Sequence, residues 1–327
     1  MINRTSLRIK VLQAVYAYLE SGEDNLEKGL NHLMESVDKM KDLFVWQLSF
    51  LIETKRFAEN RIEENKRKNL PTKEDLNPNM RYVNNRVIKA LENNKQLRKE
   101  EERLKINWAD HQDIIRGYYN MMRNTEEYMN YMTADVDDFN HDKNFIVTMI
   151  KNYFSDLEVL QDFYEEKSIF FVDDYHLVSA MLLKFINDMK VSFNEDSLLP
   201  SLYKIDKKDD VNNKDFIRTL FRETIMHNDE YTKLIGDNVN EKKWEKDRIC
   251  VMDMIILKMA ITEFLCMSYI PVKVTMNEYI EISKYFSTPK SKIFVNGILD
   301  KLLKKFREEN AIHKKRCWSH RMMIIMR

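Results

Sequence analysis

The chain has 327 residues, enough for two core-forming units at roughly 100 to 200 residues per domain, and its five glycines and five prolines exclude a fold rich in tight turns. With 32% charged residues, a mean hydropathy of -0.54 and no apolar run near the roughly 18 residues of a membrane span, it is predicted to be soluble. Lys plus Arg equals Asp plus Glu at 53 each, so attraction to a polyanion must come from a local patch rather than from the net charge.

The first predicted element is a helix over residues 3–19. Leu7, Val11 and Val15 recur at i, i+4 and i+8, which is the spacing of one buried helical face. Asn3 precedes this pattern and is a candidate N-cap. We therefore expect an amphipathic helix close to the N-terminus.

A long helix is expected next. The apolar residues from Leu26 to Phe44 alternate spacings of four and three, a heptad-like seam that can continue to Leu51. Breaks are predicted at Asn69-Leu70-Pro71 and at Asn77-Pro78-Asn79, because proline cannot continue a helix. The seam indicates a helix that is packed along one side.

The middle of the chain is more polar. Residues 80–130 are dense in Arg, Lys, Glu and Asn, with a thin apolar stripe from Val83 to Leu104, which favours a solvated helix or helical hairpin. The acidic stretch 135–142 lacks the ligand spacing and the glycine of an EF-hand, so it is interpreted as a loop. Apolar helices are then expected around residues 145–164 and 170–189.

The last part of the chain has the strongest helix signals. After a polar connector over 194–214, a largely apolar helix is predicted over 244–267 and ends before Ile270-Pro271. Thr275 to Glu278 has the pattern of a capping box, and Thr288-Pro289 has the pattern of an N-cap followed by a first-turn proline. Because no strand-like alternation of useful length occurs, the fold class is predicted to be all-α.

Motifs of catalysis and cofactor binding are absent. The five glycines are too widely spaced for a phosphate-cradling loop, which excludes nucleotide cofactors of that class. His313, Cys317 and His320 lie at i, i+4 and i+7, but three such residues near a chain end are weak evidence, and no metal site is predicted. We expect a protein that is not an enzyme and that needs no cofactor.

The compartment is predicted from the cysteines and from the N-terminus. Cys250, Cys266 and Cys317 are too few and too scattered for a disulfide framework, so free thiols are expected. The first residues lead directly into a helical pattern and lack the apolar region of a signal peptide. Both features favour a cytoplasmic protein.

Four motifs occur in a fixed order. In one-letter code they are R-x-x-x-R-x-x-x-x-Q-A-V-Y over residues 4–16, D-x-x-x-L-K-M-A-I-x-E over 253–263, I-P-x-K-V-x-x-N-E over 270–278 and F-V-N-G-I-L-D over 294–300. In order and spacing they resemble the NusB family of transcription antitermination factors. The resemblance covers roughly a third of the chain, at its two ends.

The resemblance implies an all-helical protein that binds boxA-type single-stranded RNA in nascent ribosomal RNA transcripts. It also implies two partners, the small-subunit ribosomal protein NusE and the RNA polymerase antitermination complex. Residues 1–22 and 213–310 are then the NusB-like core, residues 23–212 are a helical insertion of unknown role, and residues 311–327 are a basic tail that is expected to be disordered.

The resemblance also carries a set of RNA-binding residues. An aromatic ring bordered by lysines suits single-stranded RNA, because bases stack on the ring and ammonium groups neutralise phosphates. The residues expected to bind RNA are Arg4, Arg8, Lys10, Tyr16, Lys292, Phe294, Asn296 and Lys301. Asp253 and Lys290 match positions towards the NusE interface, although Lys290 stands where the family has an acidic residue.

Each assignment has a structural alternative. Arg8 projects onto the same helical face as Val15, so a paired structural arginine is the alternative to a phosphate ligand, whereas Lys10 points outward. Phe294 lies at the margin of the apolar arc and could be peripheral core, and Tyr16 lies at a similar boundary.

Two other functions are also compatible with the sequence. One is a helical scaffold in which the insertion is the working part. The other is an RNA-binding accessory domain of an RNA-modification system, because NusB-like domains precede some RNA methyltransferases.

Overall fold

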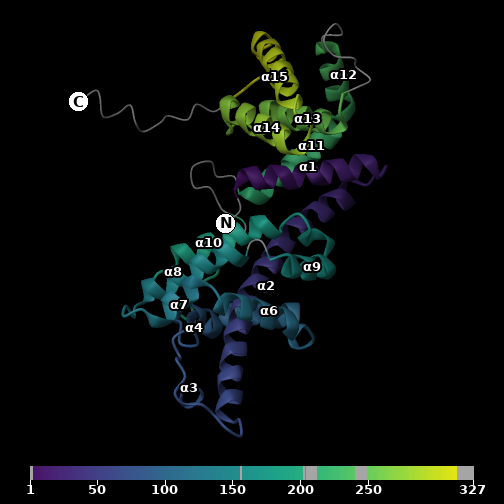
Figure 1. Ribbon diagram of the computed structural model, residues 1–327. Helices are drawn as coiled ribbons and strands as arrows, with labels where there is room; N and C mark the ends of the chain where they lie inside the picture. Colours follow the sequence, from purple (N-terminus) through teal and green to yellow (C-terminus); the bar gives the residue numbers. More distant parts are fainter. Residues whose placement is uncertain (1–2, 155–156, 202, 204–211, 240–248, 315–327) are drawn as a thin grey trace, which may run out of the picture. The chain divides into compact units, whose positions relative to one another are not determined.

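The computed structural model describes residues 3–154, 157–201, 203, 212–239 and 249–314 (Figure 1). Across these ranges the regular elements are helices, and the predicted all-α class is confirmed. None of the described helices is both long and apolar enough to cross a membrane.

The chain divides into two compact units. The insertion unit comprises residues 38–202, and the terminal unit comprises residues 2–37 together with 203–327. The first turns of the long helix therefore belong to the terminal unit, whereas the sequence had suggested that the insertion starts at residue 23. Each unit has its own buried apolar core.

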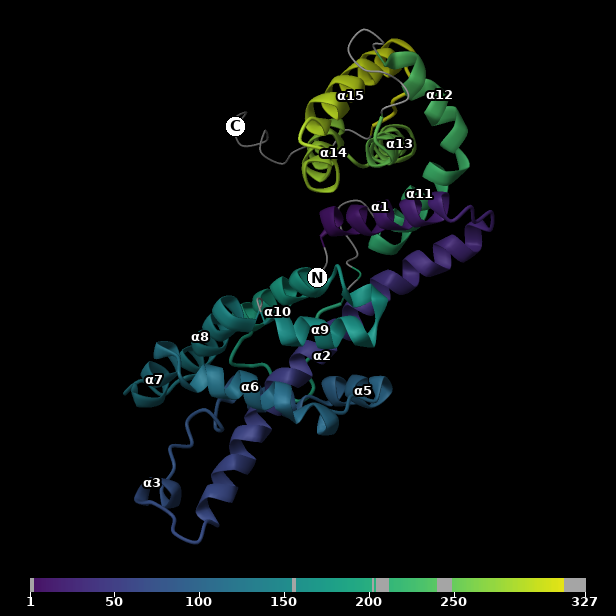
Figure 2. The same ribbon diagram turned by 45° about the vertical axis from the view of Figure 1, so that its right-hand side comes forward.

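The terminal unit contains helices from both ends of the chain. They are α1 (Arg4–Glu20), the start of α2 (Leu26–Lys66), α11 (Asn213–Met226), α12 (Asn228–Asn238), α13 (Val251–Cys266), α14 (Val272–Phe286) and α15 (Ser291–Glu308). Every residue from Ile255 to Phe264 in α13 is buried, because α1, α11, α12, α14 and α15 pack around it. Figure 2 views α13 nearly end-on, with α14 and α15 beside it.

Two features at the start of the terminal unit follow from single residues. The Asn3 side chain accepts a hydrogen bond from the Ser6 amide at 2.7 Å, so the predicted N-cap of α1 is confirmed. A Cβ on Gly29 would lie 2.5 Å from the Tyr18 ring and 2.9 Å from Phe221. Glycine at this position therefore allows the first turns of α2 to approach α1 and α11 closely.

The predicted capping box at Thr275 is wrong. Helix α14 begins earlier, at Val272, with Pro271 at the N-cap position and no side-chain cap. Thr275 lies inside the helix and is fully buried, and its hydroxyl donates to Glu263 Oε2 at 3.0 Å. The Thr275 hydroxyl, which the local pattern had assigned to a helix cap, therefore forms a hydrogen bond with the buried Glu263 carboxylate of α13.

The start of α15 also differs from the sequence expectation. Thr288 was predicted as its N-cap, but the helix begins at Ser291. The Ser291 hydroxyl accepts a hydrogen bond from the Thr288 amide at 3.1 Å and lies 2.8 Å from the Thr288 hydroxyl. Thr288 and Pro289 therefore form a turn that leads into the helix.

The insertion unit is built around the rest of α2. Its other helices are α3 (Lys73–Leu76), α4 (Arg86–Asn93), α5 (Lys95–Leu104), α6 (Gln112–Arg123), α7 (Glu126–Thr133), α8 (Phe139–Met149), α9 (Glu158–Lys167) and α10 (Tyr175–Asp188), with short helical turns η1 (Ala109–His111), η2 (Ile150–Phe154) and η3 (Ile169–Phe171). Aromatic side chains of α2 pack edge to face with its neighbours; Trp46, for example, lies 5.3 Å from Trp108 between ring centroids. The long helix and its break before Pro71 are confirmed.

The expectation of a solvated helix or hairpin over 80–130 is wrong, since this region folds into several short helices with a buried face. Asn85 and Asn94, both fully buried, cap the starts of α4 and α5. The Asn94 amide also donates to the backbone carbonyls of Asn194 and Ser197. Such distant partners explain why the break between α4 and α5 was not visible in the local pattern.

The end of the chain is described only in part. Cys250 and Cys266 are free thiols, as expected. Cys317, His320 and most of the basic tail lie outside the described residues.

Candidate nucleic-acid interface

A buried ionic cluster holds the two ends of the chain together in the terminal unit. Arg8 is 2% exposed and forms a fork with Glu263, with Nε 2.6 Å from Oε1 and Nη2 3.1 Å from Oε2. The Tyr279 hydroxyl donates to the same carboxylate at 2.9 Å, and Arg8 Nη1 lies 3.3 Å from Glu278 Oε2. Helix α1 is thereby joined to α13 and α14.

The charge of Arg8 in this cluster is balanced by nearby carboxylates. Burial alone would lower the pKa of Arg8, but the adjacent Glu263 carboxylate outweighs it and raises that pKa above its usual value. Burial, reinforced by Glu263, raises the pKa of Tyr279, which keeps its hydroxyl available as a donor. Since Arg8 is charged and faces two carboxylates inside the fold, the cluster has a structural role.

These contacts correct two sequence assignments on α1. Arg8 was expected to bind RNA, but its guanidinium is enclosed by the core, so the structural alternative holds. Lys10 was expected to point outward, yet it is only 5% exposed. Neither side chain is presented to a ligand at the surface.

Phe294 on α15 requires a similar correction. Its ring was expected to stack on a base, but the side chain is only 4% exposed. At 100° per residue it lies at the margin of the buried arc, and the surrounding helices cover that margin. The structure therefore places Phe294 in the core, where it positions α15.

The other predicted residues of α15 lie on the surface, at two edges of its exposed arc. Lys292 and Asn296 are exposed near one edge. Lys301 is exposed near the other, where its ammonium group donates to the Asn238 carbonyl at 3.0 Å. The helix separates these two groups by roughly 140° or more at 100° per residue, so they form two contacts rather than one.

A row of lysines follows the second edge. Lys290, Lys301 and Lys304 fall within about 60° of one another around the axis of α15, and all three are exposed. Gly297 lies between them, and a Cβ there would meet nothing within 4 Å, so the glycine leaves the helix backbone open to an approaching ligand. Lys304 was not among the residues expected to bind RNA, although the same helical projection places it on this side of α15.

Two predicted residues of α1 remain accessible to a ligand. Tyr16 is 40% exposed. Arg4 is half-buried, with its guanidinium carbon 5.6 Å from the centre of the Phe216 ring and 5.3 Å from that of Tyr269. These aromatic contacts orient the Arg4 side chain.

The two residues predicted at a protein interface lie together at the start of α15. Asp253 is 5% exposed, and its Oδ2 accepts a hydrogen bond from the Ser291 hydroxyl at 2.7 Å. Lys290, which directly precedes Ser291, is exposed. Asp253 is buried and holds the first turn of α15 through Ser291. Of Asp253 and Lys290, only Lys290 is exposed.

Comparison with known proteins adds to this geometry. A model of the NusB family matches residues 177–304. The chain is 36% identical to the transcription antitermination protein NusB of Salinibacter ruber over 116 residues, which is 36% of this chain and 71% of the relative. It is 35% identical to the protein of the same name from Chloroherpeton thalassium, over 32% of this chain and 49% of the relative.

A third relative, the NusB protein of Finegoldia magna, is 38% identical over 31% of this chain and 70% of its own length. No solved structure matches the chain. Each of these alignments covers about a third of the chain, and the family match begins within α10 and ends within α15.

Proposed function

Since this chain belongs to the NusB family, we propose that it binds boxA-type single-stranded RNA in nascent ribosomal RNA transcripts, together with the ribosomal protein NusE. It is a transcription antitermination factor. In the proposed complex, the bound RNA and NusE connect the chain to RNA polymerase, which then reads through terminators. Binding alone performs this role, so no catalytic step is assigned to the chain.

The lysine row of α15 is the observation that carries the proposal. Lys290, Lys301 and Lys304 present three ammonium groups beside the open backbone at Gly297. Ammonium groups along one side of a helix neutralise phosphates of an extended strand and release its counterions. A bare glycine lets the sugar-phosphate backbone approach the helix more closely than a larger side chain would.

The proposed RNA contacts are the exposed or half-exposed members of the predicted set. They are Arg4, Tyr16, Lys292, Asn296 and Lys301, with Lys304 added from the structure. Tyr16 provides a ring on which a base can stack, and Asn296 offers an amide that can read a base edge. Arg8, Lys10 and Phe294 act indirectly, by holding α1 and α15 in place.

The partner contact is proposed at the start of α15. Lys290 is exposed there, and Asp253 holds the turn beneath it through Ser291. A lysine at this position favours an acidic group on NusE. Lys290 is also the first member of the lysine row, so RNA and NusE would bind to adjoining surfaces that meet at this residue.

The test is an equilibrium titration of the full chain with fluorescein-labelled boxA-type RNA and with a scrambled RNA of the same composition. The expected result is tighter binding of the boxA-type RNA, and a further gain when NusE is present. Equal affinity for the two RNAs in both conditions would overturn the proposed specificity. A boxA preference that NusE does not change would overturn the proposed partnership.

A further inference from the structure

The insertion unit contains a groove that the proposed RNA contacts do not use. It has a volume of about 550 Å³ and is lined by the C-terminal half of α2, the segment that carries α3, and helices α6 and α7. Both ribbon views show the α3 segment running beside the end of α2 (Figures 1 and 2). All of its lining residues lie within the insertion unit, between Ala58 and Thr133.

Two arginines that line this groove each lie near the ring of the same tyrosine. The guanidinium carbons of Arg61 and Arg123 lie 5.9 and 5.7 Å from the centre of the Tyr119 ring. Arg61 also donates to the Asn120 side chain at 2.9 Å. The ring and the amide hold the arginines in place, but both partners are uncharged, so these contacts leave the two positive charges without an anion.

No carboxylate among the described residues forms an ion pair with Arg61 or Arg123. Of the two acidic residues that line the same groove, Asp75 is engaged by the Thr72 amide at 3.0 Å and by Lys68 at 3.6 Å. Glu74 is exposed on the α3 segment. Arg61 and Arg123 therefore keep guanidinium N–H groups that can donate to an external anion.

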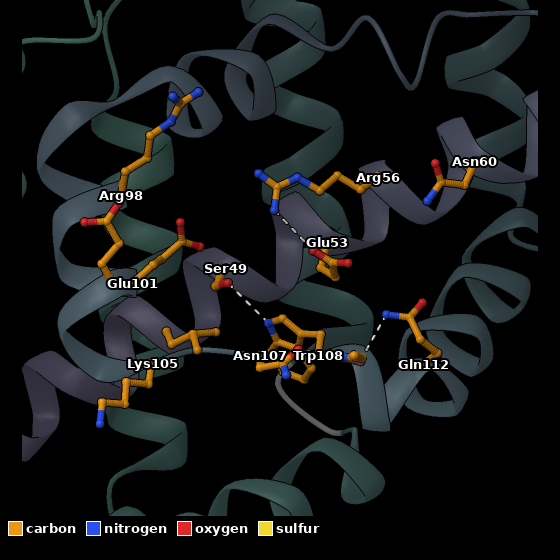
Figure 3. Close-up of a pocket in the computed structure, with 13 residues that line it drawn as sticks. Ser49, Glu53, Arg56, Asn60, Arg98, Glu101, Lys105, Asn107, Trp108 and Gln112 are labelled. Carbon is orange, nitrogen blue, oxygen red and sulfur yellow. Dashed lines mark hydrogen bonds and ion pairs between the residues drawn. The ribbon is translucent and has the colours of Figure 1, made fainter.

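A larger hollow in the same unit shows the opposite arrangement (Figure 3). It is lined by Arg56 and Arg98, among others, and its volume is about 920 Å³. Arg56 is paired with Glu53 at 3.3 Å and with Glu92 at 3.0 Å, and Arg98 donates to the Glu92 carbonyl at 2.8 Å. Because Arg56 is already paired with two carboxylates, this hollow does not present two guanidinium groups without a carboxylate partner.

The rest of the groove is largely apolar. Met129 is 53% exposed and Met132 is half-buried, so flexible thioethers form its accessible apolar surface. The rings of Tyr82, Tyr119 and Tyr128 line the groove but are all at most 9% exposed. Bases need an accessible ring face for stacking, so the groove favours an apolar side chain over RNA.

We propose that this groove binds a segment of a partner protein that carries an acidic side chain beside an apolar one. The carboxylate accepts hydrogen bonds from Arg61 and Arg123, whose planar forks match a carboxylate. The apolar side chain packs on Met129 and Met132. Nothing in this proposal depends on RNA binding by the terminal unit.

The test selects phage-displayed random peptides on the full chain and on a variant with Arg61→Gln and Arg123→Gln. Selected peptides should combine Asp or Glu with Leu, Ile, Met or Phe, and the variant should not enrich them. The best peptide is then titrated by fluorescence anisotropy. Arg123→Gln should weaken it roughly 10-fold to 150-fold, the value of one charge-assisted hydrogen bond.

Arg116→Gln is the matched control, because Arg116 is exposed on the same helix, α6, but does not line the groove. It should leave peptide affinity unchanged. Arg123→Lys keeps the charge and loses the fork, so an intermediate loss is expected. Methyl NMR of labelled methionines should show peptide-induced shifts at Met129 and Met132, which also establishes that each variant is folded.

Three results would overturn the proposal: no acidic and apolar enrichment over the double variant, equal losses for Arg116→Gln and Arg123→Gln, or peptide shifts elsewhere than Met129 and Met132. Polyuridine RNA is titrated in parallel. If RNA rather than peptide depends on Arg123, the groove is a nucleic-acid site. The titration of the full chain with boxA-type RNA is independent of all of these outcomes.

Discussion

Arg8 in the terminal unit and Arg61 and Arg123 in the insertion unit are held by different kinds of partner. In the terminal unit, Arg8 is buried and faces the carboxylates of Glu263 and Glu278. In the insertion unit, Arg61 and Arg123 share the ring of Tyr119 and have no carboxylate partner among the described residues. A buried arginine that faces carboxylates holds the fold together, whereas one held by an uncharged ring retains its capacity for a ligand.

The insertion unit also has a buried carboxylate of its own. Asp142 is 2% exposed and accepts hydrogen bonds from the Arg86 amide at 2.9 Å, the Arg86 guanidinium at 3.0 Å and the Tyr131 hydroxyl at 2.8 Å. The partners of Asp142 lie within the middle of the chain, while Arg8 and Glu263 come from its two ends. The two clusters should therefore stabilise the two units separately.

The largest effect is expected for Glu263→Gln, because it leaves the Arg8 charge buried with only Glu278 as a counterion. Breaking a buried pair in this way costs about 3 to 5 kcal/mol of unfolding free energy. Urea denaturation followed by circular dichroism measures the loss, and hydrogen exchange locates it in α1, α13 and α14. Glu278→Gln, at a carboxylate 26% exposed, is the control and should cost much less. Equal losses for the two variants would contradict this account of the cluster.

A smaller loss is expected for Asp142→Asn, about 1.5 to 3 kcal/mol for a hydrogen bond to a charged group. Asp137 is a matched control, since its carboxylate binds the same Arg86 guanidinium at 2.9 Å but is 70% exposed. Asp137→Asn should cost about 0 to 1 kcal/mol. Hydrogen exchange should report the loss for Asp142→Asn in α4, α7 and α8. Exchange that also rises in α13 would show that the two clusters are coupled.

Two glycine substitutions should have opposite signs. Gly29→Ala places a Cβ 2.5 Å from the Tyr18 ring and should destabilise the terminal unit by about 1 to 3 kcal/mol. Gly297→Ala meets open space within a helix and should stabilise it by up to about 1 kcal/mol. Thermal melts measure both changes. If Gly297→Ala also leaves boxA affinity intact, close approach of RNA to this glycine is wrong.

A pH-dependent effect is expected for Lys314, which donates to the carbonyls of Glu263 at 2.6 Å and Met267 at 2.8 Å. Burial lowers the pKa of Lys314 to about 8. Between this pKa and the usual value of about 10.4, the folded chain binds fewer protons than the unfolded chain, so this lysine makes stability rise with pH. Melting temperatures from pH 7 to 10 should therefore rise relative to those of Lys314→Met. A constant difference between the two chains would contradict the lowered pKa.

The sequence predicted the elements whose signals are local. Asn3, the periodicity from Leu7 and the proline at 71 were sufficient for α1 and for the end of α2. The prediction for residues 80–130 was wrong because Asn94 looks like a solvated polar residue in the sequence. In the structure, its side-chain amide donates to the backbone carbonyls of Asn194 and Ser197. A partner a hundred residues away leaves no mark on local periodicity.

The candidate site was predicted in part for the same reason. Helical projection placed Arg8 on the apolar face, but only the fold shows that Glu263 completes its charge. Helical projection placed Phe294 at the margin of the apolar face of α15. Whether a residue at that margin is buried depends on how the neighbouring helices pack, which the sequence of α15 does not show. The groove at Tyr119 could not be anticipated, because its arginines and methionines come from separate helices.

The most direct test of the RNA account is the salt dependence of boxA binding by Lys301→Ala. If Lys301 contacts a phosphate, the magnitude of d log K / d log[salt] should fall by about 0.7, while the preference for boxA over scrambled RNA persists. Lys233→Ala is the control, because Lys233 is exposed on α12 of the same unit and has no proposed contact. A slope that stays unchanged for Lys301→Ala, or that falls equally for Lys233→Ala, would contradict the placement of RNA on α15.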